Sequence, residues 1–227
     1  MLNRKINNSI IITTAVFFAM LISFTTVYAE PVQVQSGSPL SNKDVGKTET
    51  AIGDLVTDAV RNALRTDIAL ISASELKSKD TPLAAGAVKS SDITGLISYP
   101  DDPLAVLQIK GSQIRETLEK AVSIYPQPNL GFLQVSGLSF TFDPKKNAGE
   151  RVTAIRVGSS DIDESGYYTV TVTNSMANGA LGYWKIWTKD DVKARFADNS
   201  IVKVLEAFLK ANPKIDYRSL DRITITK

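Results

Sequence analysis

Residues 49–71, ETAIGDLVTDAVRNALRTDIALI, combine two hydrophobic patterns that decide the class of the fold. From about Thr50 to Leu64 the apolar residues recur every three or four positions, which predicts an amphipathic helix, and Thr48 or Thr50 can cap it. The run Asp67–Ile71, apolar after its first residue, is typical of a buried strand. A helix followed closely by a buried strand favours an α/β class, in which helices pack against a sheet.

The rest of the chain continues this alternation of helical and strand patterns. In order, we expect a strand over Leu104–Ile109, a helix after Gly111, strands over 133–142, 151–157 and 167–173, a helix from about Ser200 and a closing strand over Arg222–Thr226. Gly137 interrupts the first alternating strand, which predicts a bulge or a close approach of another backbone. The pattern predicts one mixed α/β (α+β) domain over 47–227, with mixed sheets and about three main helices.

The N-terminal residues have the pattern of an export signal. Arg4 and Lys5 precede an apolar stretch from Ile10 to Phe24, and Val27–Ala29 fits a cleavage site between small residues. We expect a signal peptide over 1–29, with the protein exported to a periplasm or secreted and no membrane contact after cleavage; an uncleaved anchor is the alternative. Residues 30–46 are polar and rich in Ser, Gln, Gly and Pro, which predicts a linker or an extended lead-in.

The composition excludes several kinds of chemistry. The 227 residues include no Cys and no His, so disulfides, thiolate nucleophiles, imidazole bases and most transition-metal sites are excluded. Carboxylate sites for Ca²⁺ or Mg²⁺ and acid–base chemistry by Asp, Glu, Lys or Tyr stay open, and no cofactor is predicted. Since Arg4 and Lys5 are two of the 26 basic residues, the chain after residue 29 has 24 basic and 24 acidic residues. This neutrality argues against nucleic acid or an anionic membrane as a partner.

Five stretches, in this order and spacing, resemble the C-terminal, substrate-binding domain of the 5'-nucleotidases. They are Glu49–Arg61, Thr66–Ile71, Ser91–Thr94, Ile109–Glu119 and Gly131–Asp143, and the likeness continues through Arg151–Val152 and Tyr168–Asn174. The resemblance implies a mixed α/β domain that grips the substrate, while a separate N-terminal metallophosphoesterase domain, rich in His, holds two metal ions. We expect that domain to be absent from this chain, so the resemblance implies no catalytic residue and no metal ligand here.

Three loops grip the substrate in that family, and the resemblance places each of them here with altered residues. Ser72–Lys77 (SASELK) aligns with N-G-G-G-I-R, Tyr99–Asp102 (YPDD) with P-F-x-N, and Ser175–Tyr183 (SMANGALGY) with F-x-x-x-G-G-D-G-Y. By family position, the candidate ligand-binding residues are Lys77, Tyr99, Asp102, Met176 and Tyr183. A lysine lacks the fork of the family's arginine, and each lost stacking ring costs about 1–3 kcal/mol, so we expect nucleotide affinity to fall by several powers of ten.

Each candidate has a structural alternative. Lys77 can be a solvated loop lysine, Tyr99 can cover the edge of the sheet, and Asp102 can belong to a turn rather than to a cation site. An aromatic cluster at the third loop can be core packing, a ligand platform or a protein-binding patch. Its members are Tyr183, Trp184 and Trp187.

The sequence predicts an exported binding module related to nucleotide catabolism that does not hydrolyse its ligand alone. Its partner would be a nucleotide, another small phosphorylated ligand or a protein. The alternative is the substrate-binding subunit of a split 5'-nucleotidase, with a metallophosphoesterase as a separate chain. A structural or cell-surface component that uses the fold only as a scaffold is the third hypothesis, because fold alone does not fix function.

Overall fold

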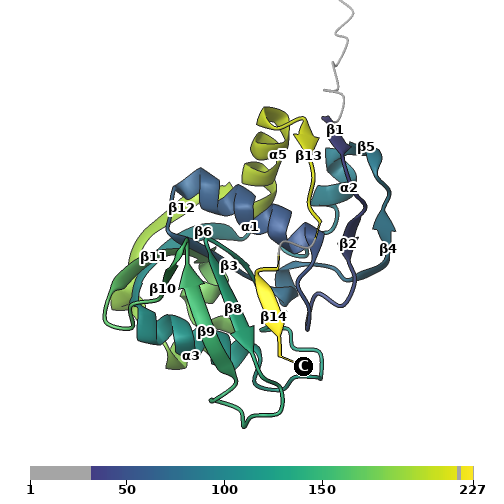
Figure 1. Cartoon of the computed structure of the whole chain (residues 1–227). Helices are drawn as coiled ribbons and strands as arrows, with labels where there is room; N and C mark the ends of the chain where they lie inside the picture. Colours follow the sequence, from purple (N-terminus) through teal and green to yellow (C-terminus); the bar gives the residue numbers. More distant parts are fainter. Residues whose placement is uncertain (1–31, 219–220, 227) are drawn as a thin grey trace, which may run out of the picture. The chain divides into compact units, whose positions relative to one another are not determined.

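The computed structural model describes residues 32–218 and 221–226, and the predicted signal peptide over 1–29 lies outside them (Figure 1). A five-stranded sheet organises this region, in the order β12-β6-β11-β3-β7. Its strands are β3 (Ile68–Ser72), β6 (Pro103–Lys110), β7 (Leu133–Ser136), β11 (Tyr167–Thr173) and β12 (Val192–Ser200). The sheet is mixed, because β3 and β11 run parallel while the other neighbours pair antiparallel.

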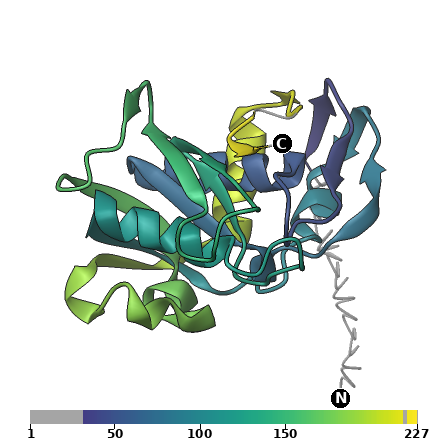
Figure 2. The same cartoon turned by 60° about the horizontal axis from the view of Figure 1, so that its bottom comes forward.

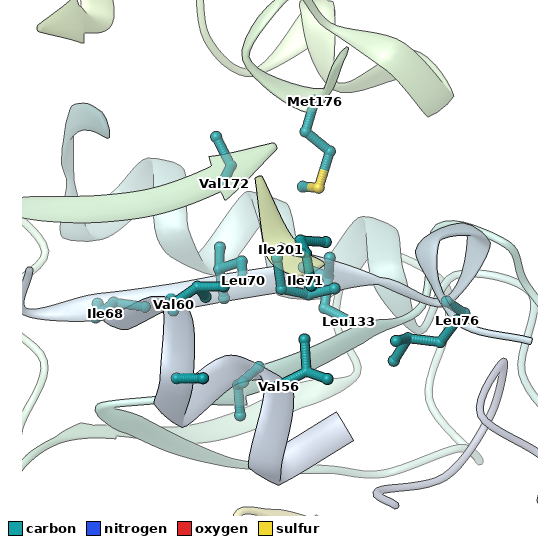
Figure 3. Packing of buried hydrophobic residues seen from close by; sticks show 14 of the residues in the cluster. Val56, Val60, Ile68, Leu70, Ile71, Leu76, Leu133, Val172, Met176 and Ile201 are labelled. Atoms are coloured by element: carbon teal, nitrogen blue, oxygen red, sulfur yellow. The ribbon is translucent and has the colours of Figure 1, made fainter. Parts of the chain in front are cut away.

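Helices cover both faces of this sheet. α1 (Ala51–Leu64) packs against β3, β7 and α5 (Ile201–Ala211), whereas α3 (Gly111–Ala121) and the short α4 (Asn174–Ala177) contact β6. Figure 3 shows Val56 of α1 on one side of β3 and Met176 of α4 on the other. The 3₁₀ segment η2 (Ala180–Lys185) lies beside α3 (Figure 2), where Gln113 Nε2 donates to Ile186 O at 2.9 Å. β3 is therefore covered on both faces, which explains its continuous apolar run.

The start of α1 is fixed by a buried glutamine. Thr50 caps the helix, and its hydroxyl accepts from Gly53 N at 3.0 Å. Gln134 of β7 is fully buried; its Oε1 accepts from Thr50 N, and its Nε2 donates to Val45 O and Thr48 O. A side chain at position 53 would collide with the Gln134 amide, so Gly53 is what lets the helix approach the strand.

Smaller sheets flank the five-stranded one. The first contains β8 (Leu138–Phe142), β9 (Val152–Val157), β10 (Ser160–Asp161) and β14 (Ile223–Ile225), in the order β10-β9-β8-β14. The second has the order β13-β1-β5 and consists of β1 (Gln33–Ser36), β5 (Gly86–Lys89) and β13 (Lys214–Ile215). β2 (Leu40–Asn42) pairs with β4 (Lys79–Leu83), and short helical turns are formed by η1 (Ala73–Glu75), α2 (Ser90–Thr94) and η3 (Lys189–Asp191).

The first two strands lie within residues 30–46, where the polar composition predicted a linker or an extended lead-in. The segment is extended and pairs with the rest of the domain: β1 pairs with β5 and β13, β2 pairs with β4, and both Val34 and Leu40 are buried. Every second residue of β1 is buried, so a short alternation between core and solvent carries the strand. Four residues are too few for that alternation to stand out against the surrounding Ser and Gln.

The class of the fold, the main helices and one glycine agree with the expectation from the sequence. The mixed α/β class is confirmed, and the three main helices are α1, α3 and α5. Ser200 caps α5, where its hydroxyl accepts from Lys203 N at 3.4 Å. Gly137 has φ +79, and a Cβ there would collide with Asp67 O, so the glycine does mark a close backbone approach.

Candidate functional site

The topology of the five-stranded sheet brings the three loops of the sequence analysis to one edge. β3 and β11 run parallel, so the loops that follow Ser72 and Thr173 leave from the same edge. β6 runs antiparallel to β11 and pairs Leu104 with Thr173, so the turn Tyr99–Asp102 enters the sheet there too. Stretches that lie about 100 residues apart in the chain therefore meet in space, and we call this place the three-loop edge.

Hydrogen bonds link the loops at the middle of this edge. Glu75 Oε1 accepts from Thr173 Oγ1 at 3.3 Å, and Asp102 Oδ2 accepts from the backbone N of Ser175 at 3.2 Å. The backbone N of Ser98, just before Tyr99, donates to Glu75 O at 2.8 Å. Each loop thus contributes to one polar cluster, and we call Glu75, Asp102, Thr173 and Ser175 the carboxylate site.

The electrostatics of the carboxylate site are unusual for a loop. Glu75 is only 3% exposed, and its Oε2 has no hydrogen-bond partner among the described residues. Burial, and then the negative charge of Asp102, raise the pKa of Glu75 to about 7, although the bond from Thr173 works in the opposite direction. At neutral pH this carboxyl is therefore divided between its neutral and its charged form.

Of the five candidate residues, Asp102 belongs to the carboxylate site, Tyr99 lies in the same turn, and Lys77 lies at the surface of the first loop. Asp102 is half-buried and belongs to the site itself, while Tyr99 is 57% exposed and its backbone O accepts from Asp102 N at 3.3 Å. Lys77 is exposed, and its Nζ donates to Gly95 O at 3.0 Å. The charge of Lys77 is thus held at the surface by a backbone carbonyl.

The other two candidates are buried. Met176 and Tyr183 are almost completely inaccessible, Tyr183 OH donates to Gly131 O at 2.8 Å, and the ring stacks on Trp187 at a centroid distance of 4.9 Å. Burial raises the pKa of the Tyr183 phenol well above its usual value. The core-packing alternative thus describes these two side chains, and they hold the third loop in place rather than face solvent.

Trp184 is the exposed aromatic residue of the third loop. Its side chain is 64% exposed, and Lys185 Nζ lies 5.4 Å from the centre of its ring. The sequence marked Trp184 only as one member of an aromatic cluster. The sequence does not show that Tyr183 is buried while Trp184 is exposed. The reason is that η2 contains Leu181 and Gly182 with positive φ, so its side chains follow no regular period.

Sequence reasoning also missed the role of Glu75. The residue was noted only as part of the altered first loop, yet it lies at the centre of the three-loop edge. The available signal was a glutamate directly after a fully buried strand, at a position where the resembling family has glycine. An acidic side chain so close to the core has to be paired, neutralised or functional.

A second polar cluster joins the last strand to α1. Arg222 forms a two-bond fork with Asp58, with both N–O distances at 2.9 Å, and Tyr217 OH donates to Asp58 Oδ2 at 3.1 Å. Asp54 is buried 3.7 Å from Arg222 Nε, and burial raises its pKa to about 9 against the opposing charge of Arg222. These contacts attach β14 to the helix, which indicates a structural role.

Two hollows lie on the α1 side of the molecule. One of about 400 Å³ is lined by Asp58, Arg61, Asn62, Ser136, Gly137, Phe208 and Arg222. Another of about 390 Å³ runs between α1 and α5 and is lined mainly by small and apolar side chains such as Ala59, Ala63, Val204 and Phe208. Both are separate from the three-loop edge.

The comparison with known proteins agrees with this architecture. The family model described as "5'-nucleotidase, C-terminal domain" matches residues 25–189. The chain belongs to this family. A crystal structure of a 5'-nucleotidase precursor from Thermus thermophilus superposes on this 5'-nucleotidase C-terminal domain with a TM-score of 0.77 and 25% identity, over 88% of this chain and 40% of that one.

Curated relatives are similar over a part of their length. Human 5'-nucleotidase is 25% identical over 193 residues, which is 76% of this chain and 33% of that protein. Endonuclease YhcR of Bacillus subtilis (strain 168) is 29% identical over 155 residues, which is 64% of this chain and 12% of that protein. This 5'-nucleotidase C-terminal domain thus spans a third or less of the length of these two relatives.

Two further observations concern metal-binding groups and membrane-spanning helices. Within 32–218 and 221–226, no group of three or more Asp, Glu, His or Cys side chains is placed to bind a metal ion. The helices of that same region include none that is long and apolar enough to cross a bilayer.

Proposed function

We propose that this 5'-nucleotidase C-terminal domain is a binding module that holds a small ligand at the three-loop edge and does not hydrolyse it alone. The observation that carries the proposal is the carboxylate site, where residues from three separate loops meet in one hydrogen-bonded cluster. Loops on a rigid sheet edge are where binding residues concentrate, because the sheet fixes their relative positions. A nucleotide or another small phosphorylated molecule is the ligand class that the family suggests.

A binding role without hydrolysis is supported by the residues available. The 227 residues include no His and no Cys, so the usual base and nucleophile pairs have no members among them. The titratable side chains of the carboxylate site are Glu75 and Asp102 alone. Two carboxylates can bind and polarise a ligand, and they offer few of the oxygens that Mg²⁺ or Ca²⁺ requires.

We also propose that the protein is exported. The support is the leader pattern, in which Arg4 and Lys5 precede the apolar stretch Ile10–Phe24 and the small-residue site Val27–Ala29. Mass spectrometry of the protein expressed in its own host tests this proposal. A mature N-terminus at Glu30 would support it, and an intact leader in the cytoplasmic fraction would contradict it.

The binding proposal is tested by calorimetry with AMP, adenosine and a UDP-sugar, with and without Mg²⁺ or Mn²⁺. We expect a saturable binding signal that is lost in Asp102→Asn and kept in Asp101→Asn. The second variant removes the same charge from the exposed neighbouring residue, so it is a matched control. An affinity that neither substitution changes would show that the ligand binds elsewhere, and it would refute the proposal.

A second candidate is a substrate-binding subunit that docks on a separate metallophosphoesterase chain. The observation that favours it is exposed apolar surface beside the three-loop edge: Trp184 is 64% and Leu130 67% exposed, and the bond from Tyr183 OH to Gly131 O joins their two segments. Gel filtration of the two purified chains tests this idea. Association that Trp184→Ser weakens would support it, and elution as separate chains would refute it.

A further inference from the structure

We propose that the carboxylate site binds a positively charged nitrogen group of the ligand, a primary ammonium or a guanidinium. The inference rests on the proposed binding function and narrows it, because it states which chemical group lies against Glu75 and Asp102. It follows from the unpartnered oxygen of a buried carboxyl, from the second carboxyl whose charge acts on it and from an exposed aromatic ring in the turn that carries this second carboxyl.

The first step concerns the oxygen without a partner. Glu75 Oε2 is buried and accepts no hydrogen bond within the described region, while Oε1 is bound by Thr173 Oγ1. A buried acceptor that has lost its hydrogen bonds to water and gained no other hydrogen bond lowers the stability of the fold by about 1–3 kcal/mol, and by more when it is charged. An N–H donor that reaches Oε2 would recover this energy, so the site is incomplete as it stands.

The second step concerns the sign of the charge. Asp102 is close enough for its charge to act on Glu75, and its Oδ2 is already engaged by Ser175 N at 3.2 Å. Two positively charged residues near these loops are engaged by groups other than the two carboxyls: Lys77 Nζ donates to Gly95 O, and Arg195 of β12 donates to the side chains of Asn174 and Asn178 beside and within the third loop. Two carboxyls with no cation between them attract a cation, so the carboxylate site takes a nitrogen group of the ligand, and any phosphate of that ligand lies outside the site.

The third step separates an organic cation from a metal ion. Ca²⁺ takes six to eight oxygen ligands, and Mg²⁺ requires a nearly octahedral set, whereas no group of three or more Asp, Glu, His or Cys side chains among the described residues is placed to bind a metal ion. An ammonium group needs only three acceptors. Tyr99 adds a platform that a metal ion would not use, because its ring is 57% exposed in the turn that carries Asp102, and aromatic faces attract organic cations.

The carboxylate site borders solvent at Asp102, which is half-buried, and at Ser175, which is exposed. Glu75 Oε2 is itself buried, so a cation that binds at Asp102 reaches this oxygen only when the loops around it move apart. Charged Glu75 is the stronger acceptor, so binding is tighter above its pKa of about 7 than below it.

The test is an NMR titration of the full protein, with the amide signals of Ser175 and Asp102 as reporters. The probes are ethylammonium, tetramethylammonium, which has no N–H donor, and Ca²⁺. At about pH 8 we expect ethylammonium to shift both signals saturably, and at about pH 5.5 we expect an affinity at least about tenfold lower, since little Glu75 is then ionised. Glu75→Gln and Asp102→Asn should abolish the shift, whereas Asp101→Asn and Glu116→Gln, which alter exposed carboxyls, should keep it.

Each other outcome overturns the inference. Equal shifts with tetramethylammonium would show that binding needs no N–H donor, which contradicts a hydrogen bond to Glu75 Oε2, and stronger saturation by Ca²⁺ would show a metal site. No saturable shift with ethylammonium up to about 100 mM would show that no such site exists. If AMP shifts Ser175 while ethylammonium does not, the binding function survives and this inference fails; if neither they nor adenosine and a UDP-sugar do so, the proposed binding function fails as well.

Discussion

Replacing Glu75 with Gln removes the charge that the fold opposes, so it should make the protein more stable at high pH. The folded state raises the pKa of Glu75 from 4.5 to about 7, mainly through burial. The proton is therefore held more tightly in the folded than in the unfolded chain. The contribution of this proton to the free energy of unfolding is fully present below about pH 4.5, declines between pH 4.5 and 7, and is lost above that range.

The size of this effect follows from the shift. A difference between 4.5 and about 7, at about 1.4 kcal/mol per pH unit, corresponds to about 3 kcal/mol. Glutamine has the same shape and no charge, and its amide can donate a hydrogen bond toward Asp102. We therefore expect Glu75→Gln to match the parent protein at about pH 4 and to exceed its stability by about 3 kcal/mol at about pH 8.

Urea denaturation of both proteins at several pH values measures the difference. The difference between the two proteins reports the titration of Glu75 alone. The buried Asp54, whose pKa is raised to about 9, titrates equally in the parent and in Glu75→Gln. Glu116→Gln on the exposed face of α3 is the control, and its difference from the parent should be small at every pH. A Glu75→Gln protein that is less stable than its parent at about pH 8 would refute the reasoning.

Three further substitutions test the rest of the framework by urea denaturation. Arg222→Met should cost about 3 kcal/mol because it leaves the Asp58 carboxylate without its fork, and an unchanged stability would show that the pair contributes nothing. Gln134→Leu should cost about 2 kcal/mol because it leaves Thr50 N and two carbonyls without partners; a gain would mean that packing outweighs these bonds. Leu181→Gly should add up to about 1 kcal/mol since φ is +58 there, and a loss would show that the Leu181 side chain has a packing role.

The parts of the fold that the sequence predicted have strong local patterns. α1 has an apolar stripe over about four turns and a threonine at the cap, and α5 has an apolar stripe over about three turns and is capped by Ser200. β3 is a continuous apolar run because both of its faces are covered. These elements are decided by residues within a short window, so one sequence is enough to find them.

The parts that were missed depend on distant partners. β1 and β2 are short polar strands that exist because β5, β13 and β4 pair with them. β12 is a polar edge strand interrupted by register shifts, and its Lys, Arg and Asp residues hide its pairing with β6. A strand of this kind is stabilised by its neighbour, and its own residues give little indication of it.

The sequence predicted which loops form the candidate site, but it identified only some of the residues that belong to it. The family resemblance indicated the three loops and named Tyr99 and Asp102, which lie at the edge where the loops meet. It also named Met176 and Tyr183, which are buried supports of the third loop. Whether a loop side chain turns inward or outward depends on contacts such as that of Tyr183 with Gly131, 52 positions earlier, and no local pattern records such a contact.

The most direct test of the central claim is to map where a small ligand binds. Backbone amide signals of the full protein would be followed during titration with AMP, adenosine, a UDP-sugar and ethylammonium at about pH 8. The account predicts saturable shifts for at least one of them, concentrated in 72–77, 99–102 and 173–183. Shifts concentrated in the hollow between α1 and α5, or no saturable shift at millimolar concentrations, would contradict it.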